Sequence, residues 1–175
     1  MFRPLLGRAR PADPAELTAY ASLCQKKLLN AAAARLYREA ITASPALIAS
    51  PENGLRYDAA FAAALAGSGA GEDAAQLTDA ERADLRQQAR DWLRADLEAW
   101  CGLLDRDRDK ARSGHLPQRM QHWLRDPDFN GVRNPDALAK LPEAERQAWQ
   151  KLWDDVQRLL DRARATPKPA PEKKP

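Results

Sequence analysis

The feature that most restricts the fold of this chain is its near lack of β-branched aliphatic residues. Val and Ile together occur four times among 175 residues, whereas Ala occurs 35 times and Leu 23 times. Sheet cores are built mainly from β-branched and aromatic side chains, while Ala, Leu, Arg, Glu and Gln favour helices. At 44% apolar and 30% charged residues, the chain also has enough apolar surface to form a packed core. The sequence therefore predicts a globular, all-α fold.

The net charge of +3 comes from the two ends of the chain. Three Arg lie in the first ten residues, and the last ten hold three Lys and one Glu. The remaining segment, 11–165, has 22 basic and 24 acidic residues, so its net charge is −2. Nucleic-acid-binding domains need surplus cations on the folded surface. We therefore expect no nucleic-acid partner, and a helical nucleic-acid-binding protein remains only a less favoured alternative.

Three further patterns indicate the cellular compartment of the protein. No apolar run approaches the ~20 residues of a membrane-spanning helix, and the first ten residues lack the apolar stretch of a signal peptide. Cys24 and Cys101 are too few for a disulfide framework and lie within helical patterns, as expected of reduced, buried thiols. We expect a cytoplasmic protein with no membrane contact.

Helical periodicity divides the chain into a leader arm (1–13), a single helical domain (14–164) and a disordered Pro/Lys tail (165–175). Thr78 and Glu81 have the spacing of a capping box, which starts the longest helix. Six or seven helices are expected in the domain. The first helix covers 14–28 and is apolar at Leu17, Tyr20, Ala21, Cys24 and Leu28. The second runs from a turn at Asn30 to 43, the third covers 55–66, and the fourth runs from 79 to about 105. A short helix is expected near Met120 and Trp123, and the last runs from Pro142 to about 163. A mixed-charge connector (105–114) and a loop (125–135) separate the last three.

Five Trp in a chain of this length could form a binding surface, but their positions favour the core. Trp92, Trp100, Trp149 and Trp153 all fall on apolar helical faces. Trp123 is expected to wedge the loop that follows it.

Residues 14–47 form one unit of 34 residues, which is the tetratricopeptide period. Its large, small and aromatic residues fall where that family places them, with Pro45 ending the second helix, so the unit resembles a tetratricopeptide repeat. The matching positions are Leu17, Ala21, Cys24, Ala33, Tyr37, Ala40 and Pro45. A second, stretched unit follows from 53, with an insertion of about ten residues at 68–78 before its partner helix. The expected architecture is antiparallel helix pairs in a tetratricopeptide-like α-α superhelix, with a C-terminal capping helix.

The chain also resembles the helical C-terminal extension of planctomycete Ser/Thr protein kinases. The stretches that carry this resemblance are 34–40, 56–60, 85–97, 122–128 and 141–146. The resemblance implies a helical interaction or regulatory module without the kinase, because no Gly-rich phosphate loop, His-Arg-Asp or Asp-Phe-Gly motif occurs. The favoured function is therefore a non-enzymatic protein–protein interaction, scaffold or regulatory module. The alternative is a fragment or split part of a kinase polypeptide.

The Cys and His residues do not have the spacing that a metal site or a catalytic site needs. Cys24, Cys101, His115 and His122 lack the closely spaced pairs of a zinc site, and no nucleophile lies beside a base in the sequence. We therefore expect no catalytic, cofactor-binding or metal-binding residues, and no cofactor.

Two sets of residues are candidates for binding a protein or peptide partner, which could be acidic. Arg82, Arg86, Arg90 and Arg94 recur every four residues, so they form an arginine ladder on one helix face. A solvated face is the favoured interpretation, and pairing with the connector or the last helix is a further alternative. The second set, on the expected concave side, is Arg56, Tyr57, Asp58 and Phe61, for which core packing is favoured. The carboxylate clamp of tetratricopeptide domains is not reproduced, and the oligomeric state is left open.

Overall fold

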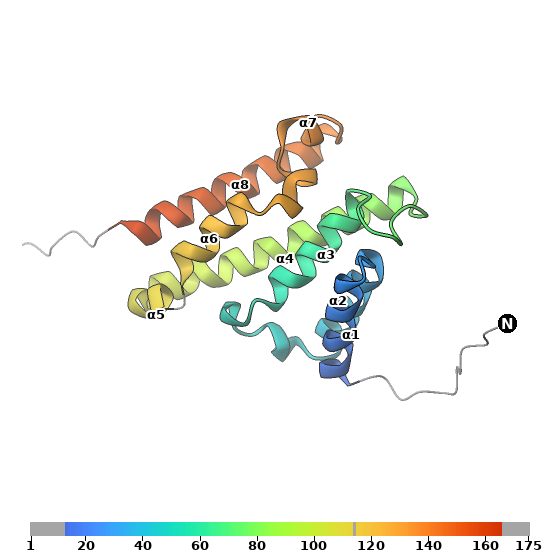
Figure 1. Ribbon diagram of the computed structural model, residues 1–175. Helices are drawn as coiled ribbons and strands as arrows, with labels where there is room; N and C mark the ends of the chain where they lie inside the picture. Colours follow the sequence, from blue (N-terminus) through green and yellow to red (C-terminus); the bar gives the residue numbers. More distant parts are fainter. Residues whose placement is uncertain (1–12, 114, 166–175) are drawn as a thin grey trace, which may run out of the picture.

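The computed structural model describes residues 13–113 and 115–165, which form helices joined by short connections (Figure 1). These ranges contain no strand, so the predicted all-α class is confirmed. Most of the expected leader arm and tail lies outside the described residues. The helices are α1 (Pro14–Lys26), α2 (Asn30–Ala43), α3 (Leu55–Gly67), α4 (Asp79–Arg106), α5 (Arg108–Ser113), α6 (Leu116–Arg125), α7 (Pro135–Leu138) and α8 (Glu143–Arg164), with 3-10 helices η1 (Pro45–Ile48), η2 (Pro51–Asn53) and η3 (Pro127–Val132).

The described ranges hold eight α-helices rather than six or seven. The additional helices, α5 and α7, are short and lie within the expected connector and loop. Only Ala111 of α5 and Leu138 of α7 are buried, so neither helix has an apolar repeat that a sequence pattern could reveal. Asn30 is the first residue of α2 rather than a separate turn, and Pro142 precedes α8 as its N-cap.

The local signals at the helix starts are confirmed. Thr78 Oγ1 accepts from the backbone N–H of Glu81, and the Glu81 carboxylate accepts from the backbone N–H of Thr78 at 2.8 Å, which completes a capping box. Asp13 caps α1, where Pro14 occupies the first turn. These contacts satisfy backbone donors that a helix leaves free at its start.

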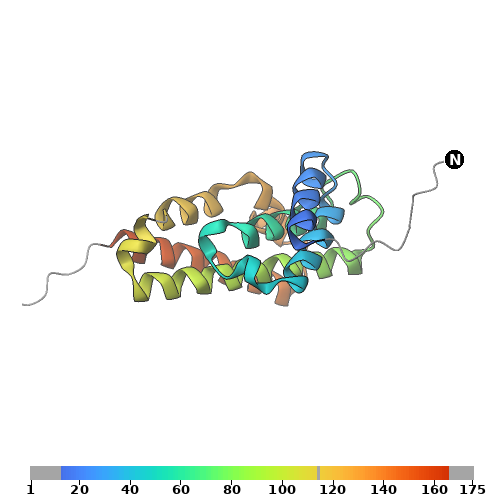
Figure 2. The same cartoon turned by 90° about the horizontal axis from the view of Figure 1, so that it is seen from below.

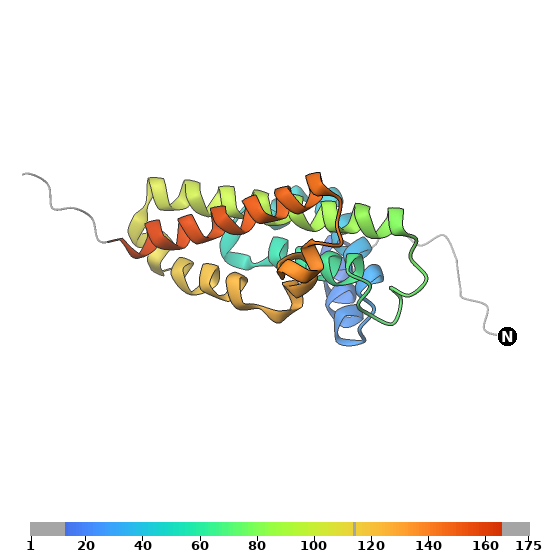
Figure 3. The same ribbon diagram turned by 90° about the horizontal axis from the view of Figure 1, so that it is seen from above.

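Consecutive helices pack in chain order from α1 to α4, and α8 packs against both α4 and α6 (Figures 1 and 3). All five Trp are at most 7% exposed, so the expected core positions of Trp92, Trp100, Trp149 and Trp153 are confirmed. Trp123 is also buried, against the ring of Tyr57 at 5.4 Å between centroids. Of the helices in the described ranges, none combines the length and apolar character of a membrane span.

The first helix departs from the expected pattern. Leu17 and Ala21 are buried, but Tyr20 is 55% and Leu28 58% exposed. α1 ends at Lys26, and Leu28 has a φ of 57°, so its side chain leaves the helical register. The two Cys are half-buried free thiols rather than fully buried ones.

α3 and α4 approach each other closely at Gly67. A Cβ atom on Gly67 would lie 2.6 Å from Arg86 Cγ and 2.9 Å from the backbone oxygen of Arg82. The buried face of α3 is otherwise almost entirely Ala, and these small side chains allow the same approach along the helix. Gly67 therefore fixes the distance between the end of α3 and the start of α4.

We expect Gly67→Ala to destabilise the protein by about 1–3 kcal/mol, because the backbone of α4 must move away. The control is Gly102→Ala within α4, where a Cβ meets nothing within 4 Å. That substitution should be neutral or stabilising by up to about 1 kcal/mol, since Ala is the better helix former. Chemical denaturation of both variants measures the difference, and equal stabilities would contradict the close approach.

Candidate functional site

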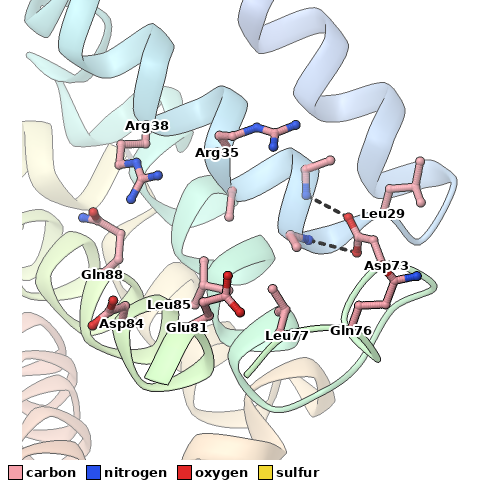
Figure 4. Close-up of a pocket in the computed structure, with 13 residues that line it drawn as sticks. Leu29, Arg35, Arg38, Asp73, Gln76, Leu77, Glu81, Asp84, Leu85 and Gln88 are labelled. Carbon is pink, nitrogen blue, oxygen red and sulfur yellow. Dashed lines mark hydrogen bonds between the residues drawn. The ribbon is translucent and has the colours of Figure 1, made fainter. Parts of the chain in front are cut away.

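A groove of about 670 Å³ lies between α2, the 68–78 loop and the first turns of α4 (Figure 4). We refer to it as the α2–α4 groove. Its apolar residues include Leu29, Leu77 and Leu85. Its polar side chains are Arg35 and Arg38 from α2, Asp73 and Gln76 from the loop, and Glu81, Asp84 and Gln88 from α4.

The 68–78 loop forms one end of the groove because it is anchored on the turn between α1 and α2. Asn30 Nδ2 donates to the carbonyl of Ala70 at 3.0 Å, and the N–H of Glu72 donates to the carbonyl of Leu28 at 2.8 Å. Gly71 has a φ of 119° and lies so close that a Cβ would be 2.7 Å from the Leu28 oxygen. The segment 68–78, which was expected to be an insertion in a second repeat unit, thus forms a defined part of the groove.

Two of the three groove carboxylates are engaged in capping helices. Asp73 accepts from the backbone N–H groups of Ala31 at 3.1 Å and Ala32 at 2.8 Å, so it caps α2 from another part of the chain. Glu81 serves the capping box of α4, and its hydrogen bonds with Thr78 hold the pKa of that carboxyl below its usual value. Both carboxylates are therefore balanced by the positive ends of helices.

The remaining charged side chains of the groove are available to a ligand. Arg35, Arg38 and Asp84 are exposed, and none has a hydrogen-bond or ion-pair partner among the described residues. The two guanidinium groups lie on the α2 wall, opposite the carboxylates of Glu81 and Asp84 (Figure 4). Sequence reasoning missed this site, because the stretch 34–40 was used only for the repeat pattern and the family resemblance, and the loop was treated as an insertion.

The arginine ladder lies against other parts of the protein, and Arg86 shows this most clearly. Its Nε and Nη2 donate to the two carboxylate oxygens of Glu145 on α8 at 2.6 and 3.0 Å. Its Nη1 donates to the carbonyl of Gly67 at 2.9 Å. The Arg86 and Glu145 side chains are only 12% and 14% exposed. Arg86 thus ties α4 to both α3 and α8.

The other ladder residues also make contacts within the chain. Arg82 Nη2 donates to the carbonyl of Ala74 at 3.3 Å. Arg90 lies over the ring of Trp149 at 5.8 Å from its centroid. Arg94 is 35% exposed and lies 3.9 Å from Asp155 of α8. The ladder faces α8 and the 68–78 loop, and partner binding by it stays a prediction.

The second candidate set, Arg56, Tyr57, Asp58 and Phe61, does not form one solvent-exposed surface. Arg56 Nη1 donates to Asp96 Oδ1 at 3.3 Å, with side chains 14% and 3% exposed. Burial raises the pKa of Asp96 to about 6, and the cations of Arg56 and Arg119 oppose this increase. Asp58 is exposed, and its carbonyl accepts from Gln25 Nε2 at 3.1 Å.

α6 and η3 cover the aromatic residues of this set. The Tyr57 ring packs edge-on against Phe129 at 5.6 Å, and Phe61 does so at 6.5 Å. The Tyr57 hydroxyl donates to the buried carboxylate of Asp126, and burial together with this carboxylate raises the pKa of Tyr57. The face of α3 that was expected to be concave is thus packed within the protein.

The carboxylate of Asp126 also has an exposed His beside it. His122 Nε2 lies 3.3 Å from Asp126 Oδ2, and the His122 side chain is 62% exposed. Asp126 Oδ1 also accepts from the backbone N–H of Asp128 at 3.0 Å, so this carboxylate holds the start of η3. In the described residues, no group of three or more His, Cys, Asp and Glu could hold a metal ion.

Comparison of the sequence with protein-family models gave no match, and neither did comparison with curated proteins or with solved structures.

Proposed function

We propose that this protein is a non-enzymatic interaction module that binds a peptide segment of a partner protein in the α2–α4 groove. The observation that carries this proposal is the pair of exposed, unengaged guanidinium groups, Arg35 and Arg38, in a groove that is also lined by Leu29, Leu77 and Leu85. Peptide sites commonly combine an apolar surface with a few polar groups that fix orientation. Because Arg forms strong paired hydrogen bonds with carboxylates, an acidic segment is the favoured ligand.

The proposal includes a tetratricopeptide-like superhelix built from α1 to α4. Its support is the packing of each helix on the next and the three-residue connection between α1 and α2, since short connections favour antiparallel neighbours. α8 would then act as the capping helix, because it lays a continuous apolar face on α4 and α6.

The relation to kinase extensions, and with it the split-kinase alternative, stays a prediction that depends on the sequence stretches alone. A kinase reading frame beside this gene would favour the split polypeptide. A free-standing gene without such a neighbour would favour an independent module.

A selection of displayed random peptides on the immobilised protein tests the proposed function. We expect the double variant Arg35→Gln with Arg38→Gln to weaken binding of the selected peptides by at least about tenfold, because each charge-assisted hydrogen bond contributes about 1.5–3 kcal/mol. The matched control is Arg106→Gln with Arg125→Gln, which removes two exposed Arg from α4 and α6. Equal binding by the groove variant, or no selected peptide at all, would refute this function.

A further inference from the structure

Four exposed side chains form a stripe along α1: Glu16, Tyr20 and Leu23 lie on the helix, and Lys27 is its C-cap residue. Their spacing of four, three and four residues puts them within an arc of about 60° on the helix. Tyr20 is 55% and Leu23 52% exposed, two of the largest exposed apolar side chains in the described residues. We refer to these four residues as the α1 stripe.

The α1 stripe has no partner within the described part of the chain. None of its four side chains makes a hydrogen bond or ion pair there, and α1 packs chiefly on α2 through its other face, where Leu17 and Ala21 are buried. α1 lies at the outer edge of the molecule (Figure 2). Single exposed apolar residues are ordinary, but two large neighbours between opposite charges have the pattern of a helix–helix seam.

The residues of the α1 stripe are arranged symmetrically about its midpoint, which favours a second copy of the same helix as the partner. Its midpoint falls between Ala21 and Ser22, and Tyr20 and Leu23 are equally far from that point. Glu16 and Lys27 are also equally far from it, on opposite sides. Two copies of α1 that run antiparallel about a two-fold axis at this point therefore match apolar to apolar and acid to base.

We propose that the α1 stripe is the interface of a homodimer formed by antiparallel pairing of two α1 helices. Tyr20 packs on the partner's Leu23, and Glu16 pairs with the partner's Lys27, each contact occurring twice. The proposal uses no residue of the α2–α4 groove and is independent of the proposed function.

The interface consists of about three helical turns from each copy, which is small beside the ~1,600 Å² of a standard interface. The dimer is therefore weak, and the fraction of the protein that is dimeric rises with protein concentration. Exposed ion pairs contribute little to affinity, but like charges placed opposite each other disfavour a pairing clearly. Charge reversal is for this reason the sharpest probe of the geometry.

Sedimentation equilibrium of the full chain at low ionic strength tests the dimer, because salt screens surface charges. We expect Glu16→Lys and Lys27→Glu each to weaken self-association by about tenfold, since each places two like pairs across the interface. When these two variants are mixed, opposite charges face each other again, and the mixture should associate at least as strongly as the unmodified protein. The matched control is Lys26→Glu, an exposed residue of the same turn outside the stripe.

Circular dichroism of each variant shows whether α1 remains folded, and Leu23→Ser removes the apolar contact without changing charge. Recovery of association in the mixture, with loss in Leu23→Ser and none in the control, supports the antiparallel pairing. A protein that is monomeric at every concentration overturns it. So does an equal response of Lys26→Glu and Lys27→Glu, or a mixture no stronger than its components.

Discussion

Replacing Arg86 by Glu should lower the free energy of unfolding by about 3–5 kcal/mol, which corresponds to a fall in melting temperature of about 10 °C. The substitution removes the paired hydrogen bonds to Glu145 and the bond to the Gly67 carbonyl. It also places a second carboxylate beside Glu145, whose side chain is only 14% exposed. Breaking a largely buried ion pair is costly because the remaining charge is left without compensation.

Two further variants distinguish loss of the Arg86–Glu145 pair from a general effect of charge on stability. Arg158→Glu on α8 changes the charge equally at a side chain that is 66% exposed, and we expect it to matter by less than about 1 kcal/mol. The exchange Arg86→Glu with Glu145→Arg should regain part of the lost stability. An unchanged melting temperature for Arg86→Glu would show that the pair does not hold α4 to α8. Lost peptide binding at unchanged stability would instead favour the ladder as a docking surface.

Fold class and helix starts could be predicted because they depend on local chemistry. The scarcity of Val and Ile excluded a sheet, and the Thr78–Glu81 box is complete within four residues of sequence. Periodicity alone placed Trp92, Trp100, Trp149 and Trp153 in the core, and they are buried. In each case the residues that decide the outcome are neighbours in the chain.

Contacts across the fold could not be predicted in the same way. A four-residue period shows that the ladder shares a face, but not that α8 lies opposite Arg86 and Arg94. Asp73 caps α2 from about forty residues away, so no local capping pattern exists at Leu29. The groove depends on this tertiary contact, and the candidate site was missed for that reason.

The burial of a charged side chain also depends on contacts between distant parts of the chain and could not be predicted. Asp96 is the example that we propose to test. The sequence analysis did not single out Asp96, which is 2% exposed and lies beside Arg56. Burial raises the pKa of Asp96 from 3.8 to about 6, so the folded state holds this proton more tightly than the unfolded chain does. The resulting stabilisation is complete below about pH 4 and is lost as the pH rises through about 6.

We therefore compare the pH dependence of unfolding for the unmodified protein and for Asp96→Asn. Relative to Asp96→Asn, the unmodified protein should lose on the order of 3 kcal/mol of unfolding free energy as the pH rises from 4 to 7. Taking the difference cancels other carboxyls that titrate in this range, such as Asp128, whose pKa is also raised by burial. Asp154→Asn, at an exposed position of α8, is the matched control. A difference that is constant with pH would mean that Asp96 is not desolvated, and that the Arg56–Asp96 contact is open to water rather than part of the core between α3 and α4.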